Sequence, residues 1–169
     1  MKRPLLLTTL SLGLIFGLYL TGRGAEAASE HLIKAADNKI FAQKLVTELT
    51  AANPDLMAIG LHGMPPGGKD QVIIAQTDDI IGRKDSGGDL EVFNQDELKI
   101  YPGTLGGKPR MKVMVVYRDG AGQKLGLVVL SFKPGPGVTA FSVHVRTNAI
   151  LAEIAKKVPN AAALYQPLD

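Results

Sequence analysis

The sequence predicts an α+β domain in which helices pack on one face of an antiparallel sheet. Amphipathic helical patterns lie near both ends of residues 28–169, and short strand patterns lie between them. These strand patterns follow one another in hairpin order, which favours antiparallel pairing. No internal repeat, low-complexity tract or linker divides the chain, so we expect one domain, residues 28–169, behind a leader of residues 1–27.

Residues 1–27 have the organisation of a secretory signal peptide. Two cations precede the uncharged apolar run Leu5–Leu20, and the small-x-small sequence Ala25–Ala27 follows it. A signal peptidase reads this arrangement, so we expect cleavage after Ala27 and a periplasmic or secreted protein. The alternative is an uncleaved segment that tethers the protein to the inner membrane, although Leu5–Leu20 is shorter than the about 20 residues of a typical span.

Composition narrows the possible functions. The leader carries three cations and one anion, so its removal lowers the net charge from +3 to +1. This balance does not favour nucleic acid as a partner, since nucleic-acid binders carry clustered Lys and Arg. The absence of cysteine excludes a disulfide framework, a thiolate metal site, a thiol nucleophile and a lipidated cysteine.

The first element after the leader is an amphipathic helix, expected over Ser29–Ala52. Leu32, Ala36 and Ile40 recur four residues apart and lysines take the other side, as in a helix with about 3.6 residues per turn. Asn53-Pro54 ends it, because the residue before a proline is disfavoured in the helical region. We therefore expect a long N-terminal helix.

A pair of strands follows this helix. The apolar runs Leu56–His62 and Val72–Ala75 are bounded by Gly and Pro, which is typical of strands. The connection Gly63–Asp70 is similar to a phosphate-binding loop, but Asp70 replaces the metal-binding hydroxyl and two prolines remove backbone N–H groups. We interpret it as a hairpin loop.

The middle of the chain, Asp78–Asp89, is rich in turn residues. A short helix is expected to begin within Asp89–Phe93 and to end near Leu98. The stretch Asp85–Glu91 has the carboxylate density of a calcium loop without the residue order of an EF-hand. We interpret it as a solvated turn in which Asp89 is the N-cap of the helix.

Two long strands and a helix complete the domain. The Val-rich runs Met111–Arg118 and Lys124–Lys133 are joined by the glycine-containing loop Asp119–Gln123, which predicts a hairpin. A last helix is expected over Phe141–Lys157, with lysines in its last turn, where cations favour the helix dipole. Its expected inward residues are Val143, Thr147, Ile150, Leu151, Ile154 and Val158.

The residue pattern indicates neither a catalytic nor a metal centre. His31, His62 and His144 lie far apart, and none has a ligand partner at i+2 or i+4. The motifs of serine hydrolases, zinc proteases and dinucleotide-binding proteins do not occur. We expect a protein that is not an enzyme and needs no metal or cofactor. His62 closes an apolar strand and can point into a pocket.

A set of cations lies in and beside the expected sheet. Arg83 and Lys84 follow the second strand, and Lys108, Arg110 and Lys112 enter the third. Cations that converge on a pocket suit a carboxylate, because Arg offers a bidentate fork and Lys a point charge. Alternatively, strand-edge lysines simply discourage association between sheets.

Four segments after the leading helix together resemble a known family. They are Gly60–Gly67, Ile73–Gln76, Ile81–Lys84 and Gly122–Val128. Their order and spacing are similar to the Cache family, the extracytoplasmic PAS-like sensor domains of bacterial receptors and sensor kinases. The similarity covers about Ser29–Pro167. It implies a five-stranded antiparallel sheet with a small-molecule cavity on one face, a long N-terminal helix and a C-terminal helix.

The resemblance also implies a ligand-binding site. By position, its wall would include His62, Gln76, Arg83, Lys84, Lys112 and Tyr117. Ligands in the family are often carboxylates, amino acids or other metabolites. The expected function is therefore a stand-alone periplasmic sensory domain that binds a small anionic metabolite.

Cache domains commonly lie between two membrane spans and feed an output module, and we expect neither here. The signal would then pass to a separate membrane receptor or kinase. The alternative is a ligand-free accessory protein of an envelope receptor or transport system.

Overall fold

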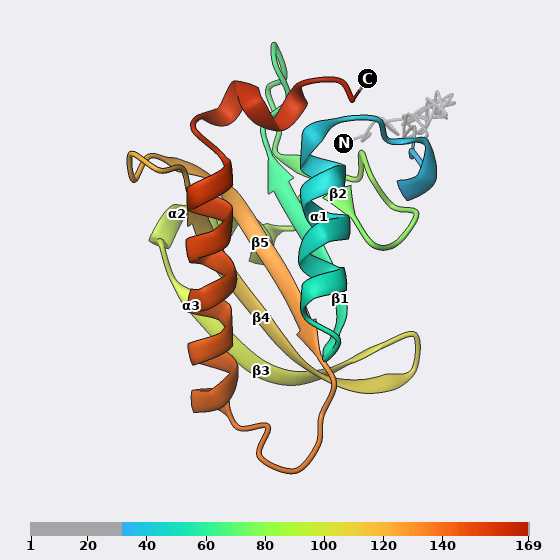
Figure 1. Ribbon diagram of the computed structural model, residues 1–169, viewed down its shortest axis with the longest axis vertical. Coiled ribbons are helices and arrows are strands. Elements are labelled where there is room, and N and C mark those ends of the chain that lie inside the picture. The colour runs from blue at the N-terminus through green and yellow to red at the C-terminus, as the bar shows by residue number, and fades with distance from the viewer. Residues whose placement is uncertain (1–31, 169) are drawn as a thin grey trace, which may run out of the picture.

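The sheet has five antiparallel strands in the order β2-β1-β5-β4-β3 (Figure 1). The computed structural model describes residues 32–168, so the leader and its expected cleavage site lie outside the described residues. The strands are β1 (Leu56–Gly63), β2 (Val72–Gln76), β3 (Leu98–Leu105), β4 (Lys108–Arg118) and β5 (Lys124–Phe132). The helices are α1 (Phe41–Ala52), α2 (Gly87–Gln95) and α3 (Ala140–Lys157), with short 3-10 helices η1 (Ala35–Asp37) and η2 (Ala161–Tyr165). The predicted α+β class and the five-stranded antiparallel sheet are confirmed.

The first α-helix begins later than the sequence predicted. It starts at Phe41, whereas the apolar periodicity placed its start at Ser29. Residues 32–40 instead form η1 and two isolated β-bridges. Ser29 and the two residues after it lie outside the described residues. The prediction of helix over 32–40 was wrong.

Contacts with distant segments explain the extended backbone before α1. Ile40 forms an antiparallel bridge with Pro167 near the C-terminus. Asn38 is buried, and its side-chain amide donates to the carbonyl of Ile74 at 2.9 Å. These tertiary contacts override a local helical pattern, which is a weak determinant alone.

Both hairpins lie where the sequence placed them, but the residue pattern did not locate β3. Pro102 and Gly103 interrupt its apolar run. β3 lies at the edge of the sheet and pairs only with β4. An edge strand tolerates proline, because one of its two sides needs no backbone N–H donor.

The helix α2 begins two residues before Asp89, and its N-cap is Ser86. The Ser86 hydroxyl accepts from the Asp89 N–H, while the Asp89 carboxylate accepts from the Ser86 N–H, a reciprocal capping box. Asp89 is therefore at the third helical position, and its prediction as N-cap was wrong. Its side chain is also buried, which corrects the interpretation of a solvated turn.

The last helix, α3, closely follows the prediction. It is capped by Thr139, and Val143, Thr147, Ile150 and Ile154 are buried along one side. Lys157 in its last turn donates to Glu48 of α1 at 2.7 Å. None of the helices in residues 32–168 is long and apolar enough to span a bilayer.

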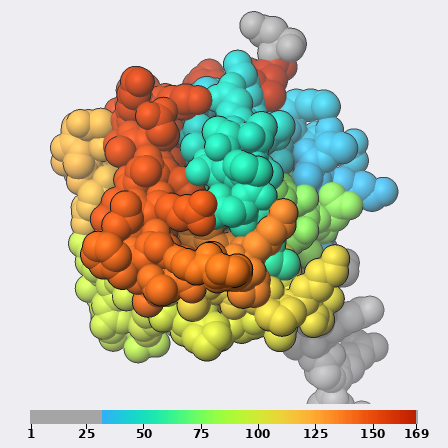
Figure 2. All heavy atoms as spheres, turned by 60° about the horizontal axis from the view of Figure 1, so that its bottom comes forward, coloured from blue at the N-terminus to red at the C-terminus, as the bar shows by residue number. Residues whose placement is uncertain are grey.

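The helices α1 and α3 lie side by side on one face of the sheet (Figures 1 and 2). The connection from β5 to α3 runs across one end of this layer (Figure 2). Alternate strand residues point into the layer, as the pleat requires. The core here includes Leu45, Val46, Ile59, Leu61, Val113, Tyr117, Val128, Leu130, Ile150 and Ile154.

The opposite face of the sheet is only partly covered. Val92 of α2 packs there against Met114 and Leu127. The expectation that all helices lie on one face was therefore wrong for α2. The remainder of this face carries polar and small side chains, and these form the candidate site.

Candidate functional site

A cavity of about 650 Å³ lies on the sheet face opposite α1 and α3. Its floor comes from alternate residues of three adjacent strands. Its wall comes from the end of β2, the connection to α2 and the first turn of α2, with Leu105 beside it. The floor residues are Ala58, Gly60, His62, Arg110, Lys112, Val129 and Ser131. The wall residues include Gln76, Asp78, Ile80, Arg83, Lys84, Ser86 and Asp89.

The small residue Gly60 makes room in the floor. A side chain there would meet the Gln76 amide, with an added Cβ lying 3.2 Å from Oε1. Gln76 thus lies over Gly60, and its amide nitrogen donates to Asp78 at 3.2 Å. Gly60 and Gln76 therefore set the shape of the cavity at the β1–β2 side.

The structure places most of the sequence-predicted site residues along this cavity. His62, Gln76, Arg83, Lys84 and Lys112 all line it. They come from β1, β2, β4 and the loop after β2, so the sheet and one connection bring them together.

Tyr117 does not belong to the cavity, and its inclusion was wrong. It is five positions from Lys112 in β4, and strand side chains alternate between faces. Tyr117 is accordingly buried in the core under α1 and α3. Burial raises the pKa of its phenol, which stays neutral.

One side of the cavity is cationic. Arg110 Nη1 donates to the buried Ser131 hydroxyl at 2.6 Å, which fixes the guanidinium against the floor. Arg110 Nε is buried without a partner among the described residues. The Lys112 ammonium lies 5.6 Å from the centre of the Tyr101 ring, a cation–π contact.

Two further cations lie in the wall. Arg83 and Lys84 are exposed, and the backbone carbonyl of Arg83 accepts from the Ile73 N–H at 2.9 Å. Lys84 Nζ lies 2.7 Å from the carboxylate of Asp70 in the β1–β2 loop. The wall cations are thus anchored by backbone pairing to β2.

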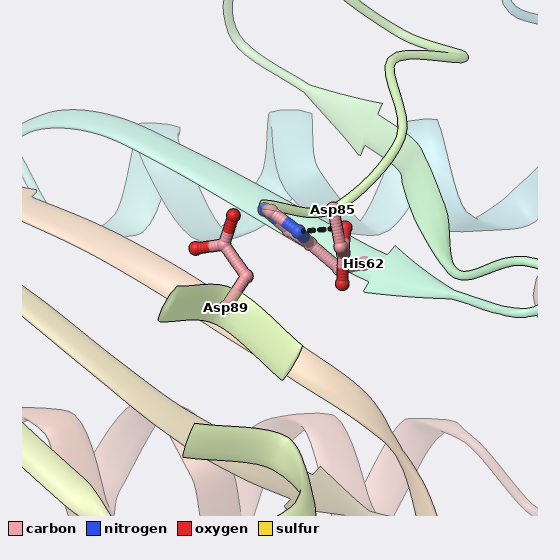
Figure 3. Close-up of side chains that lie close together, drawn as sticks. All are labelled: His62, Asp85 and Asp89. Atoms are coloured by element: carbon pink, nitrogen blue, oxygen red, sulfur yellow. Dashed lines mark hydrogen bonds and ion pairs between the residues drawn. The ribbon is translucent and has the colours of Figure 1, made fainter. Parts of the chain in front are cut away.

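The other side of the cavity holds a buried cluster of one histidine and two carboxylates, which we call the His62 cluster. It consists of His62, Asp85 and Asp89 (Figure 3). His62 Nδ1 lies 2.7 Å from Asp85 Oδ1. The imidazole stands between the two carboxylates, with the edge that bears Nε2 turned toward Asp89 (Figure 3).

The carboxylate of Asp89 is held in its ionised form. Burial raises the pKa of Asp89, but hydrogen bonds from the Ser86 hydroxyl and N–H, with the nearby charges of His62 and Lys112, outweigh burial. The pKa of Asp89 is therefore lowered overall. Both bonds from Ser86 go to the same oxygen, Oδ2, at 2.7 and 2.9 Å.

The predicted ligand-binding residues did not include several residues of the site. Arg110 belonged to the predicted cationic set, and strand alternation from Lys112 places it on the same face. Apart from its place in β5, nothing in the sequence marks Ser131 as a residue of the site. Asp85 was assigned to a solvated turn, and its partner His62 lies 23 positions away in the chain.

The arrangement offers two kinds of polar recognition within one cavity. Arg110 and Lys112 can bind an anion at the floor. The His62 cluster offers nitrogen and carboxylate ligands at the opposite side.

Comparison with known proteins assigns no family to this arrangement. No family model matches the sequence, and a search of curated proteins finds no match.

Proposed function

We propose that the chain contains a Cache-like extracytoplasmic domain that binds a small anionic metabolite in the sheet cavity. The observation that carries the proposal is the cavity floor, where Arg110 and Lys112 of β4 lie with Ser131 of β5, to which Arg110 donates a hydrogen bond. A volume of about 650 Å³ lies within the range of about 300–1,000 Å³ that small-molecule sites occupy.

The charges favour one class of ligand. The floor cations supply the charge-assisted hydrogen bonds that a carboxylate requires. Asp78 and Asp89 line the same cavity and repel further negative charge. A compact molecule with one or two carboxylates therefore fits better than a polyanion.

A thermal-shift panel tests this proposal. The purified mature protein is heated with small monocarboxylates, dicarboxylates and tricarboxylates, among them acetate, succinate and citrate. A ligand at roughly 100-fold above its Kd stabilises the folded state by about 2.7 kcal/mol. The proposal fails if no carboxylate raises the melting temperature.

A matched pair of variants locates the binding. Lys112→Gln removes a floor cation, whereas Lys108→Gln makes the same change on the same strand outside the cavity. Loss of a charge-assisted hydrogen bond of about 1.5–3 kcal/mol weakens binding roughly 10- to 100-fold. We expect this loss for Lys112→Gln and wild-type affinity for Lys108→Gln.

The proposed location is the periplasm, reached through the leader of residues 1–27. In this arrangement the domain transfers its signal to a separate membrane receptor or kinase. Sequencing the N-terminus of the exported protein tests the leader: a start at Ala28 supports cleavage, and a start at Met1 supports a tethered protein.

The second candidate function is a ligand-free interaction protein, and exposed apolar residues on α3 favour it. Phe141 is 77% exposed and Val145 is 52% exposed, one helical turn apart. Co-purification from envelope extracts distinguishes the two functions. An interaction protein loses its partner in Phe141→Ser, while a metabolite-binding domain keeps its carboxylate affinity in that variant.

A further inference from the structure

The His62 cluster has the composition and proximity of a metal site. One ligand atom from each of His62, Asp85 and Asp89 lies within 4.8 Å of the others. Ligand atoms on one zinc ion lie at most about 4 Å apart, because each bond is about 2.0–2.2 Å long. The Nε2 edge of His62 faces Asp89 (Figure 3), so small side-chain rotations bring these two ligands into bonding range of one ion.

The cluster is buried, yet it borders the cavity. His62 is 4% exposed and Asp89 is 9% exposed. The side chain of Asp85 is 1% exposed. Both His62 and Asp89 line the cavity, which gives an ion a route to the cluster and leaves room for additional ligands.

One polar atom of the cluster is buried without a hydrogen-bond partner within residues 32–168. Asp85 Oδ2 is buried without a hydrogen bond. His62 uses Nδ1 for Asp85, and the edge of its ring that bears Nε2 is turned toward Asp89 (Figure 3). An unpartnered buried polar atom is unfavourable by about 1–3 kcal/mol, so Asp85 Oδ2 indicates that the cluster lacks a ligand.

A purely structural role accounts for only part of this arrangement. The capping box of α2 needs one oxygen of Asp89, and Oδ2 supplies it to Ser86. The other carboxylate oxygen and the imidazole Nε2 remain for a further ligand. Capping alone also gives no reason for the burial of Asp85 and His62.

We propose that the His62 cluster binds one divalent transition-metal cation. His62 Nε2 and the Asp89 carboxylate are the direct ligands. Asp85 accepts from Nδ1–H and orients the imidazole, as carboxylates commonly do behind metal-bound histidines. The remaining coordination positions face the cavity, where water or an anion completes the shell.

The donor set predicts which cations bind. An imidazole nitrogen with a carboxylate suits zinc, nickel, cobalt or manganese, whereas calcium and magnesium prefer oxygen ligands alone. We expect Zn²⁺ to bind and Ca²⁺ to bind much more weakly. Tighter binding of Zn²⁺ than of Ca²⁺ would distinguish a specific metal site from non-specific attraction of cations to acidic residues.

Calorimetric titration of the purified mature protein with ZnCl₂, without any carboxylate, tests the proposal. We expect one ion per chain, and roughly 10- to 100-fold weaker binding in Asp85→Asn. Asp89→Asn should abolish binding. The control Asp78→Asn removes a cavity carboxylate outside the cluster and should bind as the wild type does.

Anomalous diffraction from a Zn²⁺-soaked wild-type crystal gives a second readout that does not depend on how the variants fold. A peak between His62 and Asp89 supports the proposal. A peak at the more exposed His144, no peak, or zinc affinity that survives in Asp89→Asn overturns it. These experiments contain no carboxylate, so failure to bind Zn²⁺ would not contradict the proposed anion site. Equally, failure to bind a carboxylate would not contradict the proposed metal site.

Discussion

Gly126 is the position where the structure makes its sharpest prediction about stability. It lies in β5 opposite Gly63 of β1, in the pairing that carries His62. A Cβ atom added to Gly126 would lie 1.9 Å from the backbone oxygen of His62 and 3.0 Å from Cε1 of Tyr117. Gly126→Ala therefore forces β1 and β5 apart next to the site.

The size of the stability loss in Gly126→Ala depends on the atoms that the new methyl group contacts. Overpacking in a core generally destabilises by about 1–3 kcal/mol, because side chains move aside. Here the closest atom belongs to the backbone of a paired strand, which cannot rotate away. We expect a loss of about 3 kcal/mol or more, and a fall in Tm of roughly 10 °C for a chain of this size.

Urea and thermal denaturation of the wild type and three glycine variants provide the assay. In Gly63→Ala the nearest atoms are flexible side-chain ends, Tyr165 Oη at 3.2 Å and Ile74 Cδ1 at 3.3 Å. We expect a loss of about 1 kcal/mol. Gly87→Ala meets nothing within 4 Å and lies in α2, so a gain of up to about 1 kcal/mol is expected. A free energy of unfolding for Gly126→Ala within about 0.5 kcal/mol of the wild type would refute the clash between the new methyl group and β1.

Three further variants test local parts of the structure. Asp119→Ala removes the buried carboxylate that accepts two backbone N–H groups of the loop Asp119–Gln123, and chemical denaturation should show a loss of about 1–3 kcal/mol. Ser86→Ala removes the N-cap of α2, with an expected loss of about 0.5–2 kcal/mol by the same measurement. Burial raises the pKa of Tyr165 to about 12, so its favourable effect on folding is complete below pH of about 10 and disappears as the pH rises toward 12. Ultraviolet titration should show a phenolate step near that pH which is absent in Tyr165→Phe, and an unchanged titration curve would contradict the burial of this phenol.

The sequence was sufficient to predict those elements whose formation depends on a local residue pattern. Both hairpins have apolar runs bounded by Gly and Pro, and these lie in β1, β2, β4 and β5. The inward side of α3 followed from its helical period. Alternation along β4 also contained the information that Tyr117 and Lys112 lie on opposite faces, although the resemblance to the Cache family grouped them.

Elements that depend on distant contacts could not be predicted from local pattern. The start of α1 is set by the bridge between Ile40 and Pro167, residues from opposite ends of the described chain. β3 contains a proline that only an edge position permits. The pairing of His62 with Asp85 depends on how the connection after β2 folds back over the sheet, and no periodicity describes such a connection.

A map of where a carboxylate binds tests the proposed function most directly. Amide chemical shifts of the isotope-labelled mature protein are measured by NMR during titration with the carboxylate that gives the largest thermal shift. We predict that the largest changes occur at the cavity, around Gln76, Lys112 and Ser131, with small changes along α3. Changes concentrated around Phe141, or none at saturating ligand, would contradict the proposal that the cavity is the binding site.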